Sequence, residues 1–287
     1  MMCTNPVNLP HRGKVPCGKC LACLQRKQKD WAFRIMQEVR SSDSAWFVTL
    51  TYDDAFLPMS VAGENGESFS FPIVSKRDVQ LWLKRLRKSI EPCKIRYFIA
   101  SEYGPKTFRP HYHAIIFGLP FKKNVVYESI VQTWKNGFVQ VAPVTLGRAY
   151  YVAKYSCSFS LLPAYLQRRK YRPFFLSSRR GGIGIGFLTE SVVESFRQSP
   201  KSYVVLAGGV KQSMPRYYRE KLYDDDMKAE LSDSAYISNI DKRLKLIKED
   251  EKLYKARGLT GLLASEAEKV DTFNRRLLNR IKQNSKL

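Results

Sequence analysis

The chain has 287 residues, of which 44% are hydrophobic and 13% aromatic, so it is not a disordered protein, and we expect one large domain or a domain with an appendage. It carries 49 Lys and Arg against 26 Asp and Glu, a net charge of +23 that predicts a polyanionic partner, with nucleic acid favoured over an anionic membrane surface. The sequence shows neither an apolar run of transmembrane length nor a signal-peptide core, so we expect no membrane association and a cytoplasmic location.

Four cysteines near the N-terminus form a cluster in the sequence. Cys17, Cys20 and Cys23 are each separated by two residues, and Cys3 can complete a tetrahedral site of four thiolates across a short loop. This spacing favours a structural zinc ion. The alternatives are reduced thiols that pack a turn and an iron–sulfur cluster, for which a further cysteine shortly after Cys23 is missing.

The elements expected after this cluster alternate between helices and strands, with a polar loop over 62–70. The expected helices span 25–39, a segment that begins at the capping-box-like Ser75-x-x-Asp78, 124–134 and 148–156. The expected strands span 46–51, 95–101, 109–117 and 138–144. The order β-α-β-β-α-β predicts an α+β fold with a central antiparallel sheet of the ferredoxin-like split βαβ type. In that topology the first and third strands are central, and the second and fourth lie at the edges.

Two of the three histidines, His111 and His113, lie one residue apart on the expected strand over 109–117. Side chains alternate across a strand, so both imidazoles face one side of the sheet while Tyr112 faces the other. Such a pair suits a metal ion, and Glu102, at the end of the preceding strand, is a candidate third ligand. Imidazoles alone favour zinc, whereas open coordination and cellular abundance favour Mg²⁺ or Mn²⁺. The alternative is two hydrogen-bonded histidines and an ordinary strand-end carboxylate without a metal.

Tyr151 and Tyr155 are four residues apart on the last expected helix, which places both phenols on one face, with Lys154 close by. A phenol can attack a phosphodiester and leave again, so that cleavage stores the bond energy in a phosphotyrosine ester. Two tyrosines allow one to hold a DNA 5′ end while the other cuts, and Lys154 can stabilise phenolate or phosphate charge. The alternative is an ordinary pair of tyrosines on an amphipathic helix.

A basic stretch with interleaved aromatic rings spans 166–180. Charges that follow phosphates beside rings that stack on bases predict binding of single-stranded nucleic acid, and the alternative is a solvated basic loop over a hydrophobic plug. The candidate DNA-binding residues are Arg109, Arg168, Arg169, Lys170, Arg172, Arg179 and Arg180. The rings are Tyr165, Tyr171, Phe174 and Phe175.

Together these residues resemble the HUH endonuclease superfamily, in which a His-hydrophobic-His strand binds the metal and a helical tyrosine is the nucleophile. The segments PCGKCLAC, FVTLTYD, SEYGPKTFRPHYHAIIFG, YYVAKY and MPRYYREKLY, between Cys3 and Tyr223, resemble the replication initiators of gokushovirus-type microviruses. The resemblance implies that His111 and His113 are metal ligands with Glu102 as the third, and that Tyr151 and Tyr155 are nucleophiles. The chain departs from the superfamily pattern at Tyr112, where an aliphatic residue is usual.

The resemblance implies a rolling-circle replication initiator, a metal-dependent endonuclease and strand transferase that forms a 5′-phosphotyrosine intermediate and rejoins DNA. Its partners would be single-stranded or origin DNA and the helicase and polymerase machinery of a bacterial host, in whose cytoplasm it would act. Two alternatives stay open from the residues alone. One is a single-tyrosine relaxase or transposase, and the other is a non-catalytic basic protein that binds single-stranded DNA or RNA.

We expect three regions along the chain. A Cys-rich segment and basic helix occupy 1–40, a nickase domain with a basic-aromatic extension occupies 41–200, and a mostly helical region occupies 201–287. In the last region an amphipathic helix is predicted by the spacing of Leu263, Ala267, Val270, Leu277 and Ile281.

Overall fold

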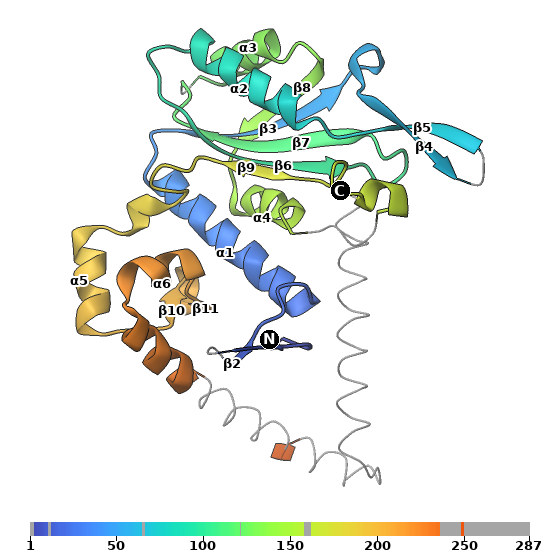
Figure 1. Ribbon diagram of the computed structural model, residues 1–287. Coiled ribbons are helices and arrows are strands. Elements are labelled where there is room, and N and C mark those ends of the chain that lie inside the picture. The colour runs from blue at the N-terminus through green and yellow to red at the C-terminus, as the bar shows by residue number, and fades with distance from the viewer. Residues whose placement is uncertain are drawn as a thin grey trace. The chain divides into compact units, whose positions relative to one another are not determined.

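The computed structural model describes residues 3–10, 13–64, 67–120, 122–157, 162–235 and 248–249 (Figure 1). The chain divides into two compact units, one of Met1–Ser195 with Met214–Tyr218, and the other of Phe196–Ser213 with the residues from Arg219 on. The amphipathic pattern predicted over 263–281 lies outside the described residues, and the three-region division stays a prediction. Within the described ranges, no helix has the length and apolar character needed to span a bilayer.

The first unit is built on a five-stranded antiparallel sheet in the order β8-β3-β7-β6-β9. Its strands are β3 (Ala45–Tyr52), β6 (Arg96–Tyr103), β7 (Pro110–Phe117), β8 (Gly137–Pro143) and β9 (Phe175–Ser177). β7 lies between β3 and β6 and pairs antiparallel with both, so β3 and β6 are parallel to each other with one strand inserted between them. This is the split βαβ arrangement, and the predicted α+β fold with a central antiparallel sheet is confirmed.

The structure corrects the prediction at two places in the sheets. β6 is not an edge strand, because β9 pairs with it along Phe98–Ala100. The segment 62–70 is not a loop but part of a hairpin formed by β4 (Met59–Glu64) and β5 (Glu67–Pro72). In β5, phenylalanines alternate with serines, and Phe71 is buried in the core while its neighbours face outward. That period-two pattern outweighs the glycines and polar residues that favoured a loop.

One face of the sheet is covered by α2 (Lys76–Ser89) and α3 (Lys123–Thr133) (Figure 1). The predicted start of α2 is confirmed, because the Ser75 hydroxyl accepts a hydrogen bond from the Asp78 N–H at 3.2 Å. Trp82 and Trp134 from this layer are fully buried and pack against each other edge to face. Tyr112 points into this core, as the alternation along β7 predicts.

The opposite face is covered by α1 (Leu21–Arg40) and α4 (Leu146–Tyr155) (Figure 1). Ala32 and Ile35 of α1 and Val152 and Ala153 of α4 are fully buried in one core with the sheet. Small alanines on both helices let the two backbones approach each other and the strands. This packing fixes α4 above the strand that carries the histidines.

The remaining elements are short. They are the strands β1 (Val7–Leu9), β2 (Gly13–Val15), β10 (Tyr203–Val205) and β11 (Lys211–Ser213), and the helices α5 (Glu190–Gln198) and α6 (Arg216–Leu222). Single 3₁₀ turns occur at Asp54–Phe56, Ala164–Gln167, Ile185–Phe187 and Ala207–Gly209.

Candidate active site

His111 and His113 lie on the central strand β7, on the face of the sheet that α1 and α4 cover. The register places Thr51 and Glu102 directly opposite His111, on β3 and β6, and places Thr49 and Ala100 directly opposite His113. Directly paired residues of an antiparallel sheet share a face, so both histidines, both threonines and Glu102 project to the same side. Glu102 is the penultimate residue of β6, which ends at Tyr103, close to the strand end where the sequence predicted it.

Each histidine ring is paired with a threonine hydroxyl through Nδ1. Thr49 Oγ1 lies 3.2 Å from His113 Nδ1, and Thr51 Oγ1 lies 3.1 Å from His111 Nδ1. When Nδ1 carries the proton and donates it to the threonine, Nε2 keeps its lone pair for a metal ion. Burial lowers the pKa of His111 and thus favours the neutral imidazole that can ligate.

Glu102 reaches diagonally across the sheet to His113. Its Oε2 atom lies 2.8 Å from His113 Nε2, and both side chains are largely buried. Ala100, the direct partner of His113 on β6, has only a methyl group and leaves room for this diagonal contact. Two imidazoles and a carboxylate on one face are ligand types that a divalent cation accepts. Among the described residues, only the four N-terminal cysteines form a group whose ligand atoms all lie within 4.8 Å of one another, so a cation here would require His111, His113 and Glu102 to move closer together.

The two tyrosines of α4 lie directly against this group. Tyr151 Oη is 3.4 Å from His113 Nε2, and the Tyr155 ring stacks on the His113 ring with a centroid separation of 5.4 Å. The two phenol rings are 4.9 Å apart, as expected for positions i and i+4 of a helix. Lys154 Nζ lies 5.4 Å from the centre of the Tyr155 ring. The structure therefore brings the candidate ligands and the candidate nucleophiles into one site.

Both phenols are held in their protonated form. Burial raises the pKa of Tyr151, and burial together with the nearby Glu102 carboxylate raises the pKa of Tyr155. A cation close to these hydroxyls would act in the opposite direction, because positive charge stabilises a phenolate. Without such a cation, the surroundings of both hydroxyls favour the neutral phenol.

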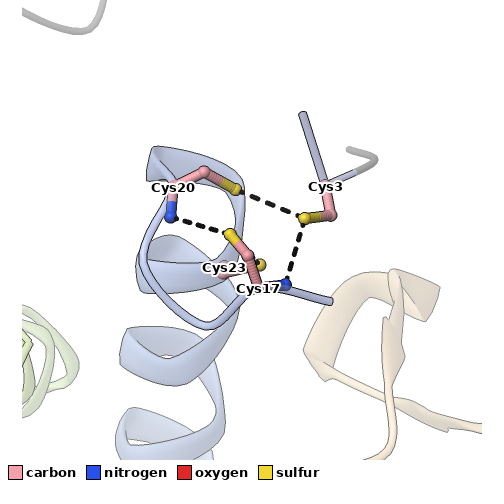
Figure 2. A group of neighbouring side chains, drawn as sticks. All are labelled: Cys3, Cys17, Cys20 and Cys23. Atoms are coloured by element: carbon pink, nitrogen blue, oxygen red, sulfur yellow. Dashed lines mark hydrogen bonds between the residues drawn. The ribbon is translucent and has the colours of Figure 1, made fainter. Parts of the chain in front are cut away.

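The four cysteines form a second cluster, at the start of α1 (Figure 2). The Sγ atoms of Cys3, Cys17, Cys20 and Cys23 all lie within 4.8 Å of one another, so they are positioned to bind a metal ion such as zinc. Backbone N–H groups of Lys19 and Cys20 lower the pKa of Cys17, whereas burial and then the adjacent thiols raise the pKa of Cys23 to about 12. Four thiolates at this separation repel one another unless a cation lies between them.

The charged residues and the rings of the basic stretch occupy different environments. All six of its candidate DNA-binding residues, between Arg168 and Arg180, are exposed. Tyr171 is buried, and Tyr165 and Phe174 pack against the same core. Phe175 packs on Phe98 and Trp31 on the other face of the sheet. The expectation that bases stack on these rings is wrong for Tyr171, which is enclosed in the core, while the other three rings are partly buried by their packing against the two cores.

Arg109 lies next to β7 and is partly exposed. Its guanidinium pairs with the exposed carboxylate of Asp54 and donates to the backbone carbonyl of Tyr52. An exposed pair of this kind is weak, so a phosphate can displace Asp54. The proposed contact of Arg109 with DNA remains compatible with this arrangement.

Sequence reasoning did not identify Thr49 and Thr51 as site residues. Their signal was present in the strand segment FVTLTYD, where two threonines alternate with apolar residues in the same way as the two histidines do on β7. Only the register between β3 and β7 shows that the two alternating pairs face each other.

Comparisons with known proteins match the same region of the chain. A family model for the replication-associated protein ORF2 group matches residues 45–159. Replication-associated protein ORF2 of Spiroplasma virus 4 is 27% identical over 301 aligned residues, which cover 95% of this chain and 87% of that protein. No solved structure matches the chain.

Two further relatives are also named as replication-associated proteins. VP4 of Bdellovibrio phage phiMH2K is 30% identical over 217 residues, 71% of this chain and 66% of the relative. ORF4 of Chlamydia phage 1 is 28% identical over 258 residues, 80% of this chain and 59% of the relative.

Proposed function

The chain belongs to the replication-associated proteins of microvirus-type phages, and we propose that it initiates rolling-circle replication by nicking and rejoining one DNA strand. One observation carries this proposal, namely the contact of Tyr151 and Tyr155 with His113 beside Glu102. A binding protein has no need of two partly buried phenols against an imidazole that contacts a carboxylate. A phosphodiester transesterase of the HUH type uses a tyrosine beside metal-binding imidazoles, and the second tyrosine supports the rolling-circle initiator over a single-tyrosine enzyme.

In the proposed reaction, the hydroxyl oxygen of Tyr151 or Tyr155 attacks the scissile phosphorus. A tyrosine O–P bond forms as the phenol loses its proton to water, the P–O3′ bond breaks, and the released 3′ oxygen takes up a proton from water to become a free 3′-OH. The DNA 5′ end stays attached to the tyrosine. One phosphodiester replaces another, so attack of a 3′-OH on the phosphotyrosine rejoins the strand without a nucleotide cofactor.

The residues of the chain have separate tasks in this reaction. His111, His113 and Glu102 would hold a divalent ion, Mg²⁺ or Mn²⁺, which when bound polarises a phosphate oxygen. Thr49 and Thr51 orient the two imidazoles through Nδ1. Lys154, beside the Tyr155 ring, supplies positive charge for the phenolate or the phosphate.

The exposed basic residues would hold the DNA strand outside the site. Arg109 and the six charged residues of the basic stretch are placed for contacts with phosphates, which give affinity without sequence preference. The free 3′-OH is the substrate of the host DNA polymerase, and the host helicase would open the duplex ahead of it. We place this activity in the cytoplasm of the bacterial host.

The test is formation of a covalent protein–DNA adduct. The full chain is incubated with labelled single-stranded origin DNA in Mn²⁺ or in EDTA, and the products are separated on a denaturing gel. We expect an adduct that requires metal, persists in each of Y151F and Y155F, and disappears when both changes are combined. Tyr150→Phe is the matched control, because Tyr150 lies on the same helix and is also partly buried.

Two results would contradict the proposal in different ways. DNA binding without an adduct in any metal would indicate a non-catalytic binding protein. Loss of all cleavage in one single variant, with normal cleavage and rejoining in the other, would indicate a single-tyrosine relaxase or transposase.

A further inference from the structure

The four cysteines of the N-terminal cluster come from two separate segments. Cys17, Cys20 and Cys23 lie in the turn and first helical turn that begin α1, whereas Cys3 comes from the segment that precedes the β1–β2 hairpin (Figure 2). The Sγ atoms of Cys3 and Cys20 are 3.7 Å apart, and those of Cys17 and Cys23 are 4.0 Å apart. The cluster therefore connects the N-terminal segment to α1.

These separations match a single tetrahedral ion. A Zn–S distance of about 2.3 Å with tetrahedral angles places thiolate sulfurs about 3.8 Å apart. None of the four cysteines is in a disulfide. An iron–sulfur cluster holds its thiolates around a core of several atoms and so separates them further than one ion does. Among single ions, a set of four soft thiolates selects zinc.

The backbone around the sulfurs has the hydrogen bonds that a thiolate site requires. The N–H of Cys20 donates to Cys17 Sγ at 3.2 Å, and the N–H of Cys17 donates to Cys3 Sγ at 3.3 Å (Figure 2). Gly18 adopts a φ of +73°, which lets the chain turn between Cys17 and Cys20. Cys20 is the N-cap of α1, and the first turn of this helix has no acidic residue, so thiolates are the anions at its positive end.

Little else holds the N-terminal segment in place. None of the described side chains in 3–10 and 15–20 is buried, and Val7 and Leu9 of the hairpin are largely exposed. An isolated two-stranded hairpin is marginal in water. A segment that contributes no fully buried side chain needs another form of attachment, and the cysteine cluster is the place where it meets α1.

We propose that Cys3, Cys17, Cys20 and Cys23 bind one structural zinc ion that fastens the N-terminal hairpin to the first turn of α1. This site is distinct from the histidine–tyrosine site and uses no residue of it. Removal of the ion releases residues 3–10 and 13–16 and frays the start of α1, while the sheet and its two buried cores stay folded.

Metal analysis of the purified full chain tests the proposal. After dialysis against metal-free buffer, we expect one zinc per chain in the wild type, in the exposed-cysteine control Cys93→Ser, and in the Y151F/Y155F double variant. We expect Cys3→Ser and Cys20→Ser to lose the bound zinc. His111, His113 and Glu102 are intact in all of these variants, so loss of zinc in the cysteine variants alone assigns the ion to the cysteines, and either proposal can fail without the other.

Cobalt substitution of the wild type keeps the test decisive where a cysteine variant does not fold. Co²⁺ added to zinc-free protein is expected to give thiolate-to-metal charge-transfer absorption and the intense visible bands of a tetrahedral site. Hydrogen exchange is expected to show loss of protection over 13–24 when zinc is removed. Iron with acid-labile sulfide, or no metal together with no cobalt spectrum, would overturn the proposal.

Discussion

The hydroxyl of Thr49 lies 3.2 Å from Nδ1 of His113, and Thr51 repeats this pairing with His111 one row further along the sheet. Both pairs result from the β3–β7 register, in which each threonine is the direct partner of its histidine. The pairing fixes the orientation of each ring and directs its Nε2 away from β3. Residues of β3 thus orient the two candidate metal ligands that β7 carries.

Replacement of Thr49 by valine tests this orienting role. Valine keeps the shape and the preference for strands but removes the hydroxyl, so we expect Mn²⁺ affinity to fall by roughly 10- to 100-fold. Thr49→Ser retains a hydroxyl and is expected to bind Mn²⁺ nearly as the wild type does. Calorimetric titration of Mn²⁺ measures both. Equal affinity in wild type and Thr49→Val would show that the threonine does not orient the ring.

The two tyrosines are expected to differ in the first cleavage. Burial raises the pKa of both phenols, and the Glu102 carboxylate raises both further, but a hydrogen bond from Tyr155 lowers the pKa of Tyr151, whereas Tyr151 raises the pKa of Tyr155. Phenolate therefore forms more readily on Tyr151. We expect Y151F to slow the first single-turnover cleavage by ~10-fold or more relative to Y155F.

Y155F is expected to accumulate the first adduct and to fail in the second cleavage, which a substrate with two origins measures. Equal first-cleavage rates in the two variants would show that the surroundings of the phenols do not determine the order. A faster first cleavage in Y151F than in Y155F would reverse the assignment.

Much of the candidate site could be predicted from the sequence because it depends on the short repeat of side-chain direction along a strand or a helix. The shared face of His111 and His113 follows from the two-residue period of a strand, and the shared face of Tyr151 and Tyr155 follows from the helical i,i+4 spacing. These relationships involve few residues and do not depend on the rest of the fold.

The contacts between elements could not be predicted in the same way. The diagonal approach of Glu102 to His113 depends on the register of β6 against β7 and on the small side chain of Ala100. A register is set by the whole sheet, and one sequence does not determine which residues are opposite each other. The pairing of β9 with β6 could not be predicted either, because β9 has only three residues, too few to show the alternation of a strand.

The aromatic residues of the basic stretch show a second reason for failure. Tyr171 and Phe174 lie in a segment with many charged residues, which suggested rings exposed for base stacking. The Tyr171 ring instead packs edge to face on Phe71 of the β4–β5 hairpin. Phe71 directly follows the segment 62–70 that the sequence assigned to a loop, and the hairpin formed there places it against the Tyr171 ring.

Tyr112 is expected to affect stability and not metal binding. Its hydroxyl accepts a hydrogen bond from the Ser75 N–H at 2.7 Å and lies 3.0 Å from the Tyr52 hydroxyl, in the core opposite the histidines. Tyr112→Phe leaves the Ser75 N–H without this partner, so we expect a loss of about 1–3 kcal/mol in the free energy of unfolding. Urea denaturation measures it.

The control for this variant is Tyr127→Phe, at an exposed position of α3 where we expect little change. Mn²⁺ affinity of Tyr112→Phe should equal that of the wild type, because the ring lies on the other face of the sheet. Weaker Mn²⁺ binding with unchanged stability would contradict the placement of Tyr112.

Glu38 joins three elements on the face of α1. It is 3% exposed, its carboxylate pairs with Arg96 of β6, and its Oε2 accepts the Gly184 N–H at 2.6 Å. Glu38→Ala leaves a buried N–H and a guanidinium without this partner. Because Arg96 is 31% exposed and can bind water, the expected loss is near the lower end for such pairs, about 2–3 kcal/mol in the free energy of unfolding.

Exposed Glu128 on α3 is the matched control site, where Glu128→Ala should change the free energy of unfolding by less than about 0.5 kcal/mol. Urea denaturation of both variants compares them, and equal stabilities would mean that water replaces the Glu38 contacts without cost.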